Sequence, residues 1–233
     1  MIKVILWDID GTLLDFSVAE KLAISKCFET HGLGICTDEM LARYSAINRK
    51  YWERLERGEI TKPEVLVGRF QEFFAKEGLP VEKAEAFNNE YQNRLGDTCV
   101  FCDNGYELVA ALKEQGYQQY AVTNGTQTAQ RKKLKNSGLN QLLDGAFISD
   151  ELGVEKPMKG FFDQVWAGIG SYNKDEVLIV GDSLTSDMQG GNNAGILCCW
   201  YNPKGLVNDR GIHVDYEIKS LQEIPGLLKA LQS

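Results

Sequence analysis

The chain has 233 residues, of which 43% are hydrophobic and 25% are charged, a composition typical of globular proteins. This length suits one large domain, or a domain that carries an inserted module. The 25 Lys and Arg residues against 33 Asp and Glu give a net charge of −8, which argues against nucleic acid or an anionic membrane as the main partner. We recognise no signal peptide and no apolar stretch of membrane-spanning length, so we expect a cytoplasmic protein. We also expect a monomer or a homodimer.

The first predicted element is a short buried strand over residues 2–7, which leads directly into Asp8-Ile9-Asp10-Gly11-Thr12. Side chains alternate along a strand, so Asp8 and Asp10 are expected to point to the same spot beyond its end. Two carboxylates placed in this way can hold a divalent cation, while one attacks as a nucleophile and the other transfers protons. The alternative is a strand that simply runs into an Asp-Gly turn.

Residues 15–97 show helical periodicity and no convincing strand. The spacing of apolar residues predicts helices over about 18–31, 40–55, 65–74 and 82–95. We therefore expect a helical insertion, or cap, over residues 15–97, between the two parts of a core formed by residues 1–14 and 98–233.

From about residue 100 the pattern changes to alternating strands and helices. Strands are predicted near 117–123, 145–149, 177–180, 197–200 and 216–218, with helices over 126–136, 158–169, 186–194 and at the C-terminus. Such alternation implies right-handed crossovers and a mostly parallel sheet covered on both faces. The predicted fold is α/β, a Rossmann-like doubly wound parallel sheet with an inserted α-helical cap.

Three further polar clusters follow predicted strands, where ligands bind in open α/β sheets. Thr123-Asn124 can offer a hydroxyl and backbone N–H groups to phosphate oxygens, or can form an ordinary Asn-Gly turn. Lys156 before a proline can reach inward as a point charge, or can be a solvated surface lysine. Asp182 ends a fully apolar strand, where a carboxylate is costly unless it is paired or binds a metal. Asp187 lies further on, where it can cap a helix or support a metal ligand.

Six cysteines are present, and Cys99 and Cys102 have the CxxC spacing of a redox pair or of half a zinc site. A zinc site needs a second pair, but the adjacent Cys198 and Cys199 would point to opposite faces of a strand. A redox pair needs a helix N-terminus just after its first cysteine, whereas Asp103-Asn104-Gly105 indicates a turn there. We therefore interpret the cysteines as buried or half-buried thiols.

Together these motifs resemble the four signature motifs of the haloacid dehalogenase-like hydrolases. The matching residues are Asp8-x-Asp10-Gly11-Thr12, Thr123-Asn124, Lys156-Pro157 and Gly181-Asp182-(x)4-Asp187, in the family's order. A helical cap inserted after the first motif is one known subclass of that family. The stretch 181–195, together with 199–203, is similar to the bacterial pyrimidine 5′-nucleotidase branch.

The resemblance implies a role for each motif. Asp8 would be the nucleophile that forms an aspartyl-phosphate, and Asp10 would be the general acid and base. Mg²⁺ would be held by the Asp8 carboxylate, the Asp10 backbone carbonyl and the Asp182 carboxylate. The phosphate would be bound by Thr123, Asn124 and Lys156, with Lys156 also catalytic, and Ser183 and Asp187 would support the ligands from behind.

The expected substrate is a small phosphorylated metabolite, most specifically a nucleoside 5′-monophosphate of the pyrimidine type. A sugar-phosphate or phosphoglycolate phosphatase is the alternative of the same fold, and a 2-haloacid dehalogenase or a non-catalytic binding protein is less favoured. Asp10 argues against a dehalogenase, which needs no second carboxylate to protonate a leaving group. A phosphonatase would use a cap lysine (Lys21, Lys26 or Lys50), and nothing marks one of them; the cap signature of a phosphoglucomutase is not evident.

Candidates for recognising the leaving group are Phe16, Tyr44, Asn48 and Trp52, although each could instead fill the core of the cap.

Overall fold

The structure, a computed structural model, describes residues 1–232. The chain divides into two compact units. The first, here called the core unit, comprises Met1–Phe16 and the chain from Cys99 onward, and the second, the helical unit, comprises Ser17–Thr98. The boundaries expected from the sequence, at residues 15 and 97, lie close to these.

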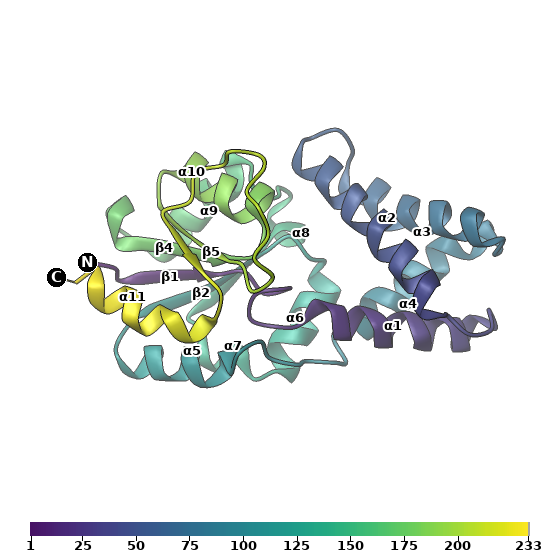
Figure 1. The fold of residues 1–233 in the computed structure, drawn as a ribbon, viewed down its shortest axis with the longest axis horizontal. Helices are drawn as coiled ribbons and strands as arrows, with labels where there is room; N and C mark the ends of the chain where they lie inside the picture. Colours follow the sequence, from purple (N-terminus) through teal and green to yellow (C-terminus); the bar gives the residue numbers. More distant parts are fainter. Residues whose placement is uncertain (233) are drawn as a thin grey trace. The chain divides into compact units, whose positions relative to one another are not determined.

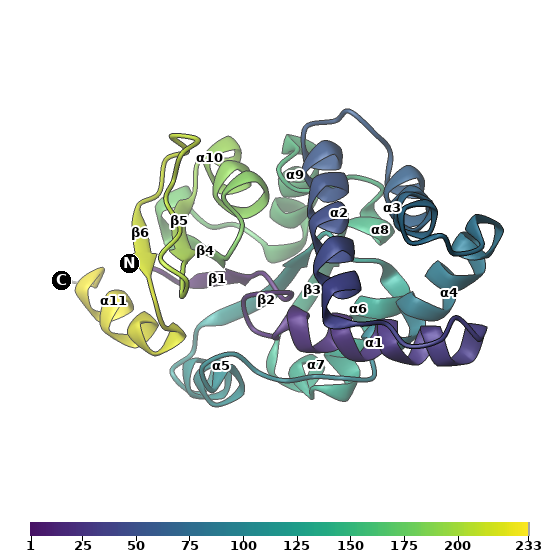
Figure 2. The same ribbon diagram turned by 45° about the vertical axis from the view of Figure 1, so that its right-hand side comes forward.

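Within the described residues, the core unit contains one six-stranded sheet in which all paired strands are parallel. The strands are β1 (Val4–Trp7), β2 (Gln118–Thr123), β3 (Gly145–Ile148), β4 (Val177–Gly181), β5 (Leu197–Tyr201) and β6 (Tyr216–Ile218). Their order across the sheet is β3-β2-β1-β4-β5-β6, and Figure 2 shows β6 at one edge beside β5. The chain therefore winds outward in both directions from β1, which places the topological switch point between β1 and β4.

Helices cover both faces of this sheet (Figure 1). They are α5 (Gly105–Glu114), α6 (Gln127–Asn136), α7 (Leu139–Leu142), α8 (Ser149–Leu152), α9 (Lys159–Ile169), α10 (Gln189–Ala194) and α11 (Ile224–Ala230). Shorter helical turns are η2 (Lys174–Glu176), η3 (Leu184–Met188) and η4 (Leu221–Glu223).

Alternate residues of each strand supply the two apolar layers, as the period of a strand requires. Ile5 and Trp7 pack with residues of α5 and α11, whereas Val4 and Leu6 pack with residues of α9 and α10. The same alternation separates the adjacent cysteines of β5, because Cys199 belongs to the first layer and Cys198 to the second.

The helical unit consists of α1 (Phe16–His31), α2 (Asp38–Glu56), α3 (Lys62–Glu77), η1 (Val81–Lys83) and α4 (Ala84–Leu95); only Phe16 of α1 belongs to the core unit. Thr37 caps α2 by accepting a hydrogen bond from Met40 N at 3.2 Å, and Glu64 completes a capping box with Thr61 at the start of α3. Gly78 ends α3 in the left-handed conformation, with φ of 67°.

Aromatic rings fill the centre of the helical unit. They include Phe28, Phe70, Phe73, Phe87 and Tyr91, and all five are buried. Their centroid separations, such as 5.0 Å between Phe70 and Phe87 and 5.2 Å between Phe70 and Tyr91, are those of favourable tilted and edge-to-face pairs.

A buried polar network crosses the same core. Arg69 is 1% exposed and donates to Asn48 Oδ1 at 2.7 Å and to Asn88 Oδ1 at 3.3 Å. Asn48 in turn donates to Glu20 Oε1 at 3.1 Å, and Ser45 donates to Glu20 Oε2 at 2.6 Å. Burial raises the pKa of Glu20, although its hydrogen bonds and the charge of Arg69 oppose the shift.

The predicted α/β fold is confirmed, with local differences from expectation. The helices α5, α7 and α8 were not predicted, and the helix predicted over 186–194 is divided into a π-helical turn, η3, and the shorter α10. A single π turn of this kind is common at functional sites. Among residues 1–232, no helix combines the length and the apolar character needed to cross a membrane.

We predict that Arg69→Ala destabilises the protein by about 3–5 kcal/mol, because it removes a buried charge and leaves its polar partners and Glu20 in an apolar core. The matched control is Arg43→Ala in the same unit. Arg43 pairs with Glu77 at 2.5 Å but is half exposed, so its loss should cost far less than the loss of Arg69. Urea denaturation followed by circular dichroism measures both, and equal losses would contradict the prediction.

Candidate active site

The candidate site lies at the carboxyl ends of β1, β2 and β4. Trp7 pairs with Val180 in the sheet register, so the chain leaves β1 and β4 at the same level and brings Asp8 and Asp182 together. Asp8 N donates to Val180 O at 2.9 Å. Thr12 Oγ1 then links the two strand ends, because it donates to Asp8 Oδ2 at 3.1 Å and accepts from Asp182 N at 3.0 Å.

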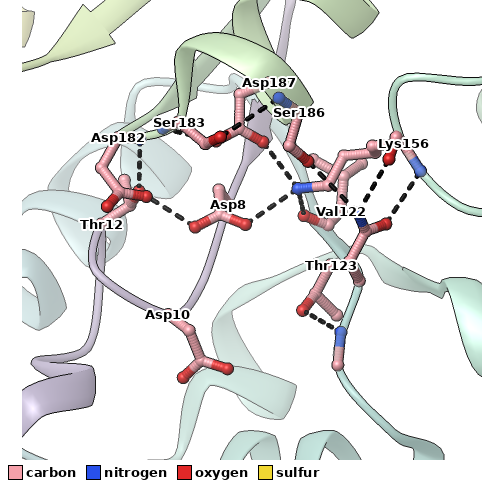
Figure 3. A network of polar contacts seen from close by, with 12 residues as sticks. Asp8, Asp10, Thr12, Val122, Thr123, Lys156, Asp182, Ser183, Ser186 and Asp187 are labelled. Atoms are coloured by element: carbon pink, nitrogen blue, oxygen red, sulfur yellow. Dashed lines mark hydrogen bonds and ion pairs between the residues drawn. The ribbon is translucent and has the colours of Figure 1, made fainter. Parts of the chain in front are cut away.

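The ammonium group of Lys156 lies at the centre of this site (Figure 3). It donates to Asp8 Oδ1 at 2.8 Å, to Asp187 Oδ1 at 2.6 Å and to Val122 O at 2.7 Å. The side chain is 1% exposed, and an ammonium group has three N–H donors. All three are therefore used inside the protein, and Lys156 can act on a bound anion through its charge.

Burial controls the electrostatics of this cluster. It raises the pKa of Asp8 to about 7, while the nearby Lys156 opposes the shift and Asp187 adds to it. Burial alone would lower the pKa of Lys156, but Asp187 and Asp8 outweigh that effect and raise it. Lys156 is therefore a fixed positive charge, and the charge of Asp8 depends on how many cations are near it.

Asp187 and Ser183 belong to a tight turn that supports Lys156. Asp187 Oδ2 accepts a hydrogen bond from Ser183 N at 3.1 Å, and Ser183 Oγ accepts one from Ser186 N at 3.1 Å. These hydrogen bonds between side chains and the local backbone stabilise the π-helical turn η3. Gly181 lies directly beneath it: a Cβ atom at this position would be 2.2 Å from Asp187 Oδ2. Only glycine leaves room for Asp187 to reach Lys156.

Thr123 and Asn124 follow β2 at the same edge of the sheet. Thr123 Oγ1 accepts from Gly125 N at 3.1 Å. The amide of Asn124 exchanges two hydrogen bonds with the backbone of Lys156, both at 2.8 Å, and donates to Ser186 Oγ at 3.3 Å. The Asn124 side chain thus holds the Lys156 segment in place, and its backbone N–H takes no part in these contacts.

Asp10 lies apart from the cluster around Lys156. Figure 3 shows its carboxylate below Asp8, outside the network of dashed lines. Its two oxygens contact α6 instead, because Lys133 Nζ pairs with Oδ1 and Gln130 Nε2 donates to Oδ2 at 2.6 Å. We did not predict Lys133 or Gln130, since Arg131-Lys132-Lys133 has the sequence pattern of a solvated helix face. The spacing of three residues between them was the available signal.

The donor set fits a divalent cation. Carboxylate oxygens of Asp8, Asp182 and Asp187 lie within 4.8 Å of one another, and Lys156 supplies one positive charge against these three carboxylates. In the described chain, no lysine or arginine forms an ion pair with Asp182, which is exposed to solvent. Hard oxygen ligands with excess negative charge are what Mg²⁺ prefers.

The four residues suggested for reading the leaving group lie in different surroundings. The Tyr44 ring is fully buried and stacks on Phe70 at 4.9 Å, and Asn48 is buried in the polar network with Arg69. Both are therefore used inside the helical unit. Trp52 and Phe16 are only partly buried. The Phe16 ring lies 5.3 Å from Lys133 Nζ.

We predict that Lys156→Met destabilises the protein by about 3–5 kcal/mol, because Asp8 and Asp187 would remain as uncompensated buried carboxylates. Lys159→Met is the matched control: its side chain is 75% exposed and its ammonium pairs with Asp163 at 2.5 Å, so a change below about 1 kcal/mol is expected. Urea denaturation at neutral pH measures both. A Lys156→Met protein as stable as the wild type would contradict the proposed burial of charge.

The chain matches known proteins over nearly all of its length. The family model of haloacid dehalogenase-like hydrolases matches residues 2–195. YfnB of Bacillus subtilis, named as an HAD-hydrolase, is 35% identical over 97% of this chain and 95% of its own length. The solved structure of YfnB bound to magnesium superimposes with a TM-score of 0.91 over 97% of this chain and 98% of that one.

Two other relatives carry names that specify an activity. The pyrimidine 5′-nucleotidase PynA of Streptococcus pneumoniae is 35% identical over 95% of this chain and 93% of its own length. The pyrimidine 5′-nucleotidase YjjG of Escherichia coli is 31% identical over 96% of both chains. By the family model and by these identities, the chain belongs to the haloacid dehalogenase-like hydrolases.

Proposed function

We propose that this protein hydrolyses phosphomonoesters through an aspartyl-phosphate on Asp8, and that its substrates are pyrimidine nucleoside 5′-monophosphates. One observation carries the proposal: two carboxylates that lie two residues apart in the sequence are bound by different partners. Asp8 is bound by the buried Lys156, whereas Asp10 is bound by Lys133 and Gln130. A nucleophile and a proton carrier need such different surroundings.

In the first step, a carboxylate oxygen of Asp8 attacks phosphorus and the bond from phosphorus to the leaving oxygen breaks. Asp10 gives its proton to the departing alkoxide, which is otherwise a poor leaving group. The charge of Lys156 and the N–H groups after β2 offset the negative charge on the phosphoryl oxygens.

In the second step, Asp10 takes a proton from a water molecule whose oxygen attacks the phosphorus. The bond from phosphorus to Asp8 breaks, which releases phosphate and restores the Asp8 carboxylate. Lys156 and Thr12 again bind the two oxygens of that carboxylate, as they do in the structure.

A divalent cation belongs to this proposal. The Asp8 carboxylate, the Asp10 backbone carbonyl and the Asp182 carboxylate would hold it, with Asp187 supporting Lys156 from the other side. When bound, Mg²⁺ supplies positive charge that keeps Asp8 ionised and offsets the charge of the phosphoryl group.

The names of PynA and YjjG support nucleotides as substrates, since both relatives match this chain over more than nine-tenths of its length. The second carboxylate supports ester hydrolysis over dehalogenation, because a halide leaves without a proton. Of the residues suggested for substrate selection, Phe16 and Trp52 remain in the proposal because both are only partly buried.

We predict that Asp8→Asn lowers kcat by at least about 10³-fold, because the amide is not a nucleophile. The assay is phosphate release from a panel of UMP, dUMP, dTMP and sugar phosphates with Mg²⁺. Asp209→Asn, at an exposed site, is the control and should retain wild-type activity. A wild type inactive on every phosphate ester but active on a 2-haloacid would contradict the proposed function.

We also predict that Mg²⁺ raises the melting temperature of the wild type. A ligand at 100 times its dissociation constant stabilises the folded state by about 2.7 kcal/mol. Asp182→Asn should abolish most of this shift, whereas Asp209→Asn should retain it. Differential scanning calorimetry in EDTA and in excess Mg²⁺ measures the shift, and an equal response from Asp182→Asn would contradict the assignment of Asp182 as a ligand.

A further inference from the structure

Helix α6 presents two polar side chains to the Asp10 carboxylate. Thr126 caps the helix by accepting from Ala129 N at 3.3 Å, so α6 starts directly after the turn that follows β2. Gln130 and Lys133, three residues apart, then lie on one face of the helix. One residue contacts each oxygen of Asp10, through Gln130 Nε2 at 2.6 Å and through the Lys133 ammonium.

Both contacts are built into the core unit. The Lys133 side chain is 1% exposed, and the ring of Phe16 covers its ammonium at 5.3 Å, a favourable cation–π distance. Gln130 packs across Gly125, where a Cβ atom would lie 2.2 Å from Gln130 Nε2. A buried ammonium requires a partner, and in the described chain that partner is Asp10.

The side-chain oxygen of Gln130 forms no hydrogen bond within the described chain. This atom, Oε1, is buried and has no hydrogen-bond partner among the described residues. A buried acceptor without a partner loses its hydration and gains nothing in return. Since Nε2 of the same amide contacts Asp10 Oδ2, a donor that fills Oε1 would lie beside the carboxylate of Asp10.

We propose that Lys133 and Gln130 are positioning residues for Asp10, and that Gln130 Oε1 accepts a hydrogen bond from the water molecule that attacks the phosphorylated Asp8. Lys133 and Gln130 Nε2 fix the direction of the Asp10 carboxylate. The water gives one proton to Asp10, its oxygen bonds to phosphorus, and the bond from phosphorus to Asp8 breaks. This inference rests on the proposed function and adds to it the residues that orient the second step.

The test compares two substrates with different leaving groups. Nitrophenolate leaves p-nitrophenyl phosphate without a proton, whereas the alkoxide of UMP needs one from Asp10. We expect Lys133→Met to lower kcat for UMP by roughly 10²-fold, within the range of acid–base catalysis, with KM changed less than about threefold. With p-nitrophenyl phosphate, rapid mixing should show a burst of about one nitrophenol per active site before a slow steady state, because water attack becomes limiting.

Gln130→Leu is the second variant, since it keeps the volume and removes no charge. It removes the unpartnered Oε1 together with the hydrogen bond from Nε2 to Asp10, so the two effects on the melting temperature oppose each other, and it should show the same burst. Lys133→Arg should recover most of the activity through its charge and donors. Lys135→Met, at an exposed site of the same helix, should behave as the wild type in every assay.

Two results would overturn the inference. If Lys133→Met and Gln130→Leu lower the rates for both substrates equally and show no burst, the residues only support the fold. If neither variant differs from Lys135→Met, they have no role in the reaction. A wild type without phosphatase activity is a different outcome, because it overturns the proposed function and this inference together.

Discussion

The burial of one ammonium group determines most of the arrangement at the carboxyl edge of the sheet. Lys156 contacts the end of β2 through Val122 O, the end of β1 through Asp8, and the turn after β4 through Asp187. A charge in this position is tolerated only when its partners stay in place. The geometry of three strand ends and the electrostatics of the site therefore depend on the same set of hydrogen bonds.

The two aspartates of the first motif have cationic partners from different segments of the chain. Asp8 pairs with Lys156 in the loop before α9, and Asp10 pairs with Lys133 of α6. Neither segment is near the motif in sequence. The fold therefore gives different surroundings to two carboxylates that are almost adjacent in the chain. The parallel sheet makes this possible, because each strand end is followed by its own loop and helix.

The strand ends could be predicted because each apolar run stops at a polar residue, as at Asp8, Thr123 and Asp182. The partners of Asp10 could not be predicted in this way, since the ring that lies over the Lys133 ammonium belongs to Phe16, more than one hundred residues away. For Tyr44, the sequence pattern left the burial of the side chain open. Its helical spacing allowed either an exposed or a buried ring, and only the packing against Phe70 distinguishes them.

The glycines beneath the site have a consequence for engineering. Replacing glycine by alanine is a common way to stabilise a protein, because it restricts the unfolded chain. At Gly181 and Gly125 the space for a methyl group is already taken by Asp187 and Gln130. Alanine at either position would therefore displace Asp187 or Gln130 and lower stability instead of raising it, whereas Gly226, with open space around it, is free to change.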